Sequence, residues 1–89
     1  MQDAYGVAAF RSRQQVLWFE QALRARGVPV SVVSTPRDIS MGCGLSVRFP
    51  LGYATEVRRA ARVANSPNMI GLYRADYAGG RLRVSPLRE

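Results

Sequence analysis

The stretch VPVSVVSTPRDISMGCGLSVRF, residues 28–49, decides the fold of this 89-residue chain. Its first part, Val28 to Ser34, is rich in β-branched valine and predicts a strand. Thr35-Pro36 ends that strand, and the next residues predict a loop that starts with one helical turn and runs to Gly44. Leu45 to Phe49 alternates apolar and polar residues and predicts a second strand. Two strands therefore follow one another with no full helix between them.

The residues before Val28 predict one strand and one helix, and the residues after Phe49 predict another helix and another strand. Apolar residues recur at helical spacing in both predicted helices, and Ser12 and Gln15 have the spacing of a capping box at the start of the first. Ala78-Gly79-Gly80 predicts a hairpin turn near the C-terminus. These elements are strands over Tyr5–Phe10 and Met69–Tyr77, helices over Gln14–Arg26 and Pro50–Asn65, and a short edge strand over Arg81–Val84.

The order strand, helix, strand, strand, helix, strand predicts an α+β protein. It is the order of the ferredoxin-like βαββαβ arrangement, an antiparallel sheet with two helices on one face. The edge strand would be an extra C-terminal hairpin strand. We expect one domain over residues 1–89, with a core at about 5–77 and a C-terminal extension at 78–89. This fold has many unrelated functions, so it leaves the function open.

Composition narrows the chemistry. The formal net charge is +7, all thirteen basic residues are arginine, and there is no histidine. Excess arginine favours an anionic partner, while one cysteine without histidine argues against a zinc site or another metal centre. We expect no cofactor. A single cysteine gives no internal disulfide, no apolar run approaches the ~18 residues of a membrane span, and the N-terminus does not resemble a signal peptide. We therefore expect a cytoplasmic protein.

The loop holds the only cysteine, Cys43, between two glycines, and its sequence resembles that of a known protein family. The run PRDISMGCG, residues 36–44, and the surrounding pattern from Tyr5 to Tyr73 resemble the small bacterial family of selenium/sulfur carrier-like proteins. The residues that match this family pattern are Phe10, Ser12, Glu20, Leu23, Gly27, Pro29, Pro36, Arg37, Ile39, Ser40, Cys43, Gly44, Arg48 and Phe49.

The resemblance implies a function for this loop. Cys43 would carry sulfur or selenium as a persulfide or selenosulfide, which requires a thiolate. Arg37 would stabilise that anion, Ser40 would add a hydroxyl donor, and Gly42 and Gly44 would let backbone amides and a partner come close. The partners would be donor and acceptor proteins. The chain would act stoichiometrically rather than as a self-sufficient enzyme, as a monomer or a homodimer.

Other interpretations stand beside this one. Free cysteine often packs as a small hydrophobe, Arg37 would equally cap a carbonyl or pair with Asp38 or Glu56, and the glycines would serve a positive-φ turn. A basic face is predicted on the second helix, formed by Arg58, Arg59 and Arg62. It favours a non-catalytic binding or accessory module for an acidic protein. Nucleic acid ranks lower as a partner, because the strands lack the aromatic spacing of RNA-binding sheets.

Overall fold

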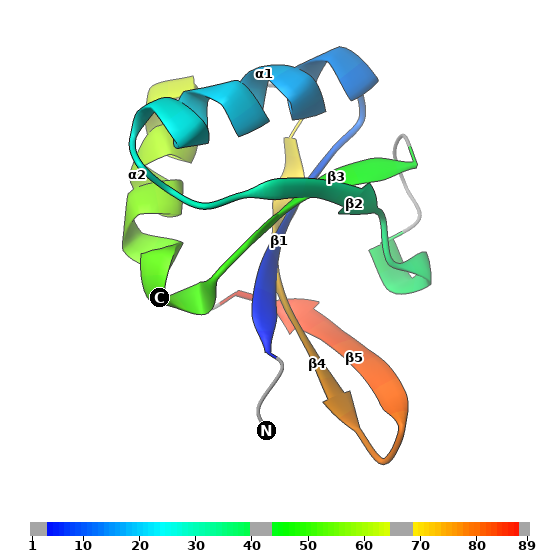
Figure 1. Cartoon of the computed structure of the whole chain (residues 1–89). Coiled ribbons are helices and arrows are strands. Elements are labelled where there is room, and N and C mark those ends of the chain that lie inside the picture. Colours follow the sequence, from blue (N-terminus) through cyan, green and yellow to red (C-terminus); the bar gives the residue numbers. More distant parts are fainter. Residues whose placement is uncertain (1–3, 40–43, 65–68, 88–89) are drawn as a thin grey trace.

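The alternating pattern of the sequence is realised as a five-stranded sheet with two helices (Figure 1). The computed structural model describes residues 4–39, 44–64 and 69–87. In chain order the elements are β1 (Tyr5–Phe10), α1 (Arg13–Ala25), β2 (Ser31–Ser34), the 3-10 turn η1 (Arg37–Ile39), β3 (Leu45–Phe49), the 3-10 turn η2 (Leu51–Tyr53), α2 (Ala54–Ala64), β4 (Met69–Ala78) and β5 (Arg81–Pro86).

The strands lie in the order β2-β3-β1-β4-β5, and every neighbouring pair is antiparallel. The helix α1 joins β1 to β2, two strands that have β3 between them, and α2 joins β3 to β4 across β1. This arrangement confirms the predicted α+β architecture with its βαββαβ element order. The predicted extra strand is also present, as β5 at the edge beside β4.

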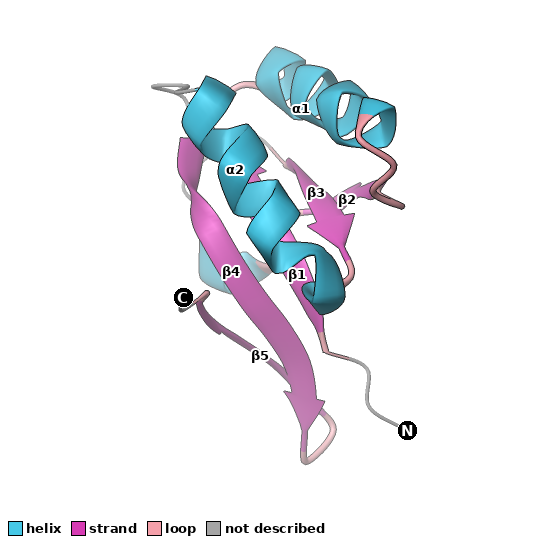
Figure 2. Cartoon of the chain, turned by 90° about the vertical axis from the view of Figure 1, so that its left-hand side faces the viewer, coloured by secondary structure: helices cyan, strands magenta, loops and turns pink. Residues whose placement is uncertain are grey.

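Both helices cover the same face of the sheet (Figure 2). The alternation of β1 directs Ala8 and Phe10 toward the helices, where they meet the buried stripe of α1 and the buried Val57 of α2. The Phe10 and Phe19 rings lie with their centroids 5.2 Å apart. This face carries the larger apolar core, because it receives side chains from the sheet and from both helices.

The opposite face of the sheet is covered by η1 instead of a helix. Val7 and Ala9 of β1 point to this side and form a second buried cluster with Ala75 of β4 and Ile39 of η1. Leu82 and Val84 of β5 pack against this cluster while remaining partly exposed. The loop between β2 and β3 is thereby tied to the sheet through an apolar side chain.

Three local expectations were wrong in detail. The strand β2 begins at Ser31 rather than Val28, because Pro29 has no N–H for the ladder. The second helix is preceded by η2, since Pro50 is extended (φ −68°, ψ 140°) and α2 begins only at Ala54. Ser12 is the N-cap of α1, but its side chain makes no capping hydrogen bond.

Candidate functional site

The predicted site lies in the loop that connects β2 to β3. The structure describes this loop up to Ile39 and again from Gly44. Ser40, Gly42 and Cys43 lie outside the described residues, so the roles predicted for these three stay predictions. The structure does place the residues on both sides of the cysteine segment, and these residues attach the loop to the sheet.

The two ends of the loop are held together at its base. The Thr35 amide donates a hydrogen bond of 2.9 Å to the Gly44 carbonyl. The Thr35 hydroxyl is also 2.7 Å from the hydroxyl of Ser46, a residue of β3 that is fully buried. A buried hydroxyl requires such a partner, so this pair explains why a serine is tolerated inside the sheet. Gly44, the residue after Cys43, is consequently fixed to the start of β3.

A second attachment lies at η1. Ile39 is only 3% exposed and packs in the second buried cluster, on the face of the sheet that carries no helix and is called the open face below. Its amide donates to the Pro36 carbonyl over 2.9 Å, which closes the turn. Burial of this side chain sets the positions of Arg37 and Asp38, which precede it directly in the turn.

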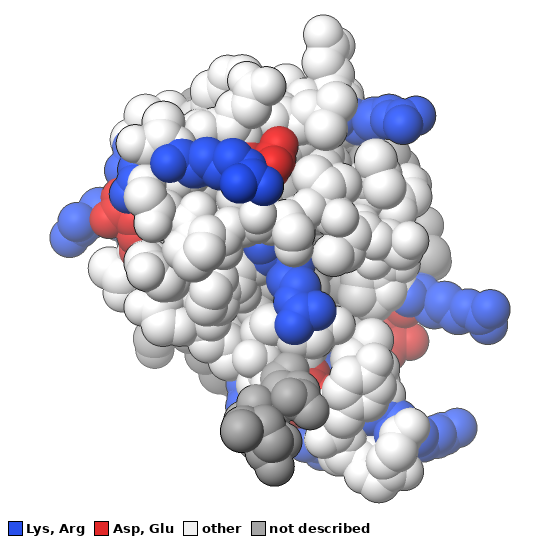
Figure 3. All heavy atoms as spheres, in the orientation of Figure 1, with Lys and Arg blue, Asp and Glu red and all other residues white. Residues whose placement is uncertain are grey.

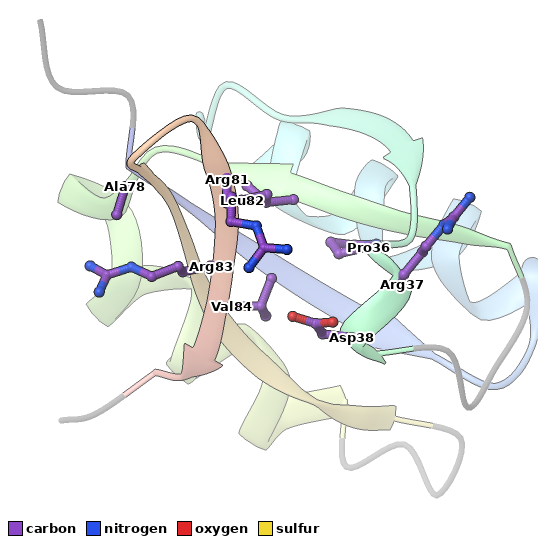
Figure 4. A pocket seen from close by; sticks show the side chains of 8 residues that line it. All are labelled: Pro36, Arg37, Asp38, Ala78, Arg81, Leu82, Arg83 and Val84. Carbon is purple, nitrogen blue, oxygen red and sulfur yellow. The ribbon is translucent and has the colours of Figure 1, made fainter.

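Arg37 and Asp38 are both exposed, and they point in different directions (Figure 4). The Asp38 carboxylate is directed toward β5, whereas the Arg37 guanidinium points away from it. Within the described part of the chain, no carboxylate lies within 4.0 Å of Arg37. The expected alternative pairing of Arg37 with Asp38 or Glu56 is therefore wrong, and Glu56 instead pairs with Arg26 at 2.7 Å.

Gly44 has no conformational need to be glycine. Positive φ among the described glycines occurs at Gly27, Gly79 and Gly80, so the positive-φ interpretation is wrong for Gly44. A methyl group added at Gly44 would meet no atom of the described residues within 4 Å. Open space at this position is compatible with the predicted close approach of a partner.

The arginines of α2 lie apart from the loop. Arg59 and Arg62 are exposed and Arg58 is half-buried, and Arg59 is 3.9 Å from Glu56. The helix α2 packs on one face of the sheet and η1 on the other, so the structure does not bring this basic face together with Arg37. Figure 3 shows the basic side chains spread over the visible face rather than gathered in one patch.

Sequence reasoning missed a cleft beside the loop. A cavity of about 560 Å³ lies between η1 and β5 (Figure 4). Its lining residues are Pro36, Arg37, Asp38, Ala78, Arg81, Leu82, Arg83 and Val84. The sequence signals an edge strand at β5, but no local pattern indicates that this strand returns beside η1.

Within residues 4–39, 44–64 and 69–87, no three histidine, cysteine or acidic side chains gather as metal ligands. No helix in the same ranges is long and apolar enough to span a membrane.

Comparison with known proteins identifies the loop as part of a family pattern. Residues 5–68 match the model of the family described as "Putative Se/S carrier protein-like". The match runs from β1 through α2 and ends before β4, so it includes the whole loop and excludes the β4–β5 hairpin. No curated protein and no solved structure matches the chain.

Proposed function

We propose that this chain, which belongs to the Se/S carrier-like family, carries sulfur or selenium on Cys43. The observation that supports this most directly is that the family match covers the entire loop, residues 35–44, in which the chain's only cysteine is found. The protein would pass the atom from a donor protein to an acceptor protein and would turn over no substrate by itself. A reducing cytoplasm would keep the thiol free.

The transfer needs no outside oxidant. The Cys43 thiolate attacks the terminal sulfur of a persulfide on the donor, a new S–S bond forms on Cys43, and the donor's S–S bond breaks. The donor cysteine leaves as a thiolate, which takes up the electron pair of the broken bond. The same exchange with a selenosulfide donor transfers selenium, and the reverse exchange delivers the atom to an acceptor thiol.

The described frame suits such a role. The Thr35–Gly44 hydrogen bond and the buried Ile39 hold the loop at both ends of its cysteine segment. Arg37 is exposed and unpaired with any described carboxylate, so its charge is available to an anion. A Cβ atom at Gly44 would meet no described atom within 4 Å. In this proposal Arg37 favours the thiolate, Ser40 donates a hydrogen bond, and Gly42 and Gly44 admit the partner's loop.

The decisive experiment is an intact-mass measurement. The purified chain is incubated with a cysteine desulfurase and L-cysteine, and its mass is recorded before and after treatment with a reductant. We expect a reductant-sensitive gain of one sulfur atom, which Cys43→Ser abolishes. If the wild-type mass stays unchanged while the desulfurase consumes cysteine, the carrier proposal is wrong. Salt-sensitive RNA binding that is indifferent to Cys43→Ser would then favour the arginine-face binding module.

A further inference from the structure

The cleft between η1 and β5 joins the family's loop to a strand outside the family match. One wall is Pro36, Arg37 and Asp38, and the other is formed mainly by β5. We propose that this cleft docks an extended segment of the donor or acceptor protein in which acidic and apolar residues alternate. The inference rests on the proposed carrier function and specifies where, and by what chemistry, the partner binds.

The strand β5 stands at the end of the sheet, and β4 is its single neighbour among the described strands. Four consecutive residues, Arg81 to Val84, line the cleft. Successive side chains of a strand point to opposite faces, so a wall made of consecutive residues is the free edge of the strand rather than one face. A free edge presents unpaired N–H and C=O groups that an extended peptide can pair with.

Basic and apolar residues alternate from Arg81 to Val84 in β5. Its apolar residues, Leu82 and Val84, pack toward the cluster on the open face of the sheet, and its arginines occupy the alternate positions. Side chains directly opposite one another in adjacent strands interact. A strand added to β5 would therefore place apolar residues beside Leu82 and Val84 and acidic residues beside Arg81 and Arg83.

Basic side chains outnumber acidic ones in the lining of the cleft. Three arginines and one aspartate line it. Arg83 is already paired, with its Nε 3.4 Å from an Asp76 oxygen. Arg81 lies in the space between β5 and η1 (Figure 4), and no carboxylate within 4.0 Å pairs with it in the described part of the chain. Because the Arg37 guanidinium points away from β5 and Asp76 offsets Arg83, the charge that acts in this space is that of Arg81, and it favours an acidic residue in the occupant.

The other edge of the sheet is a poorer platform. The strand β2 has four residues against six in β5, its sequence is Ser31-Val32-Val33-Ser34, and it presents no arginine. Beside β5, by contrast, Tyr77 pairs with Leu82 across the β4–β5 register and is 59% exposed. Exposed aromatic side chains are frequent anchors of protein interfaces. A partner held at this edge would lie against η1, four residues before Cys43 in the sequence.

The test is binding of a labelled peptide to the full chain. The probe is a fluorescein-labelled octapeptide of alternating glutamate and valine, and anisotropy is recorded at low salt. We expect saturable binding that Arg81→Glu weakens about tenfold, whereas Arg13→Glu, the same charge change on an exposed residue of α1, alters it less than twofold. In NMR spectra, amide shifts should concentrate in β5 and η1. A lysine-valine peptide should not bind.

Each contrary outcome is informative. Equal weakening by Arg13→Glu would mean unspecific attraction to a basic protein, and it would overturn the inference. Undiminished binding of a backbone N-methylated peptide would exclude strand pairing, and equal shifts from free glutamate would show a small-anion site instead. The Cys43→Ser variant should bind the peptide as well as the wild type does. Sulfur loading without peptide binding would refute this inference alone. Peptide binding without loading would refute the carrier proposal and the identity of the partner as a donor or acceptor, and would leave only the strand-docking cleft.

Discussion

Replacing Ile39 by alanine tests how the cysteine loop is held. Ile39 is the one residue of η1 that is buried, and it packs against Val7, Ala9 and Ala75 on the face of the sheet without helices. Its neighbours in the turn are exposed. The loop therefore depends on this side chain for its attachment, together with the hydrogen bond between Thr35 and Gly44.

The expected loss follows from the size of the deletion and its surroundings. Replacing a buried isoleucine by alanine costs about 2–5 kcal/mol of unfolding free energy. The lower half applies here, about 2–3 kcal/mol, because the second cluster holds four buried residues in the described part of the chain and borders a cleft into which neighbours can relax. For 89 residues the unfolding entropy is about 0.19 kcal/mol/K, so Tm should fall by roughly 10–15 °C. Ile39→Val removes one methylene and should cost about 1 kcal/mol.

The assay is thermal unfolding followed by circular dichroism, with urea unfolding as a second measure of the free energy. The matched control is Asp38→Ala, the exposed neighbour, which should change stability by less than about 0.5 kcal/mol. The folded Ile39→Ala protein should also accept sulfur on Cys43 more slowly at a temperature where it stays native. A Tm within about 3 °C of the Asp38→Ala protein would refute the claim that Ile39 anchors the loop.

Substitutions at three further positions probe the packing of the sheet and the chemistry of the loop. A methyl group at Gly6 would meet the buried ring of Phe49, so Gly6→Ala should destabilise the chain by about 1–3 kcal/mol. Gly44→Ala should leave Tm nearly unchanged and slow sulfur transfer from a protein donor. Equal Tm values for the two variants would contradict this expectation. Arg37→Gln should slow alkylation of Cys43 by iodoacetamide at neutral pH about threefold, which corresponds to ~0.7 kcal/mol, a typical contribution of one exposed charge pair. Arg37→Lys should restore most of the rate, and an unchanged rate in Arg37→Gln would argue against a role for this charge.

Much of the architecture could be predicted because it is written in local side-chain periodicity. The strands β1 and β3 have the predicted bounds, and the Val16, Phe19 and Leu23 stripe of α1 is buried as its spacing indicates. In α2, Val57 and Ala60 are buried one helical turn apart. Ala54 and Ala61 pack partly buried against the same core, as their helical spacing to Val57 indicates.

The predicted site also has parts that the sequence could predict and parts that it could not. The motif from Pro36 to Gly44 and its family could be recognised in the sequence, because both are properties of residue order. The choice among roles for Arg37 could not, because an ion pair depends on which carboxylate the fold brings near. The partner of Arg48 could not be predicted either. Its guanidinium lies 3.9 Å from the centre of the Tyr5 ring, on the face of the sheet opposite α2.

By itself, the sequence determined the order of helices and strands, the hairpin turn at Gly79-Gly80 and the loop that holds Cys43, since each depends on neighbours along the chain. Only the tertiary structure decided that Ile39 enters the open face of the sheet and that β5 returns opposite η1 to form a cleft. The physical reason is that these contacts join segments about forty residues apart, and their position depends on strand pairing and packing across the whole sheet.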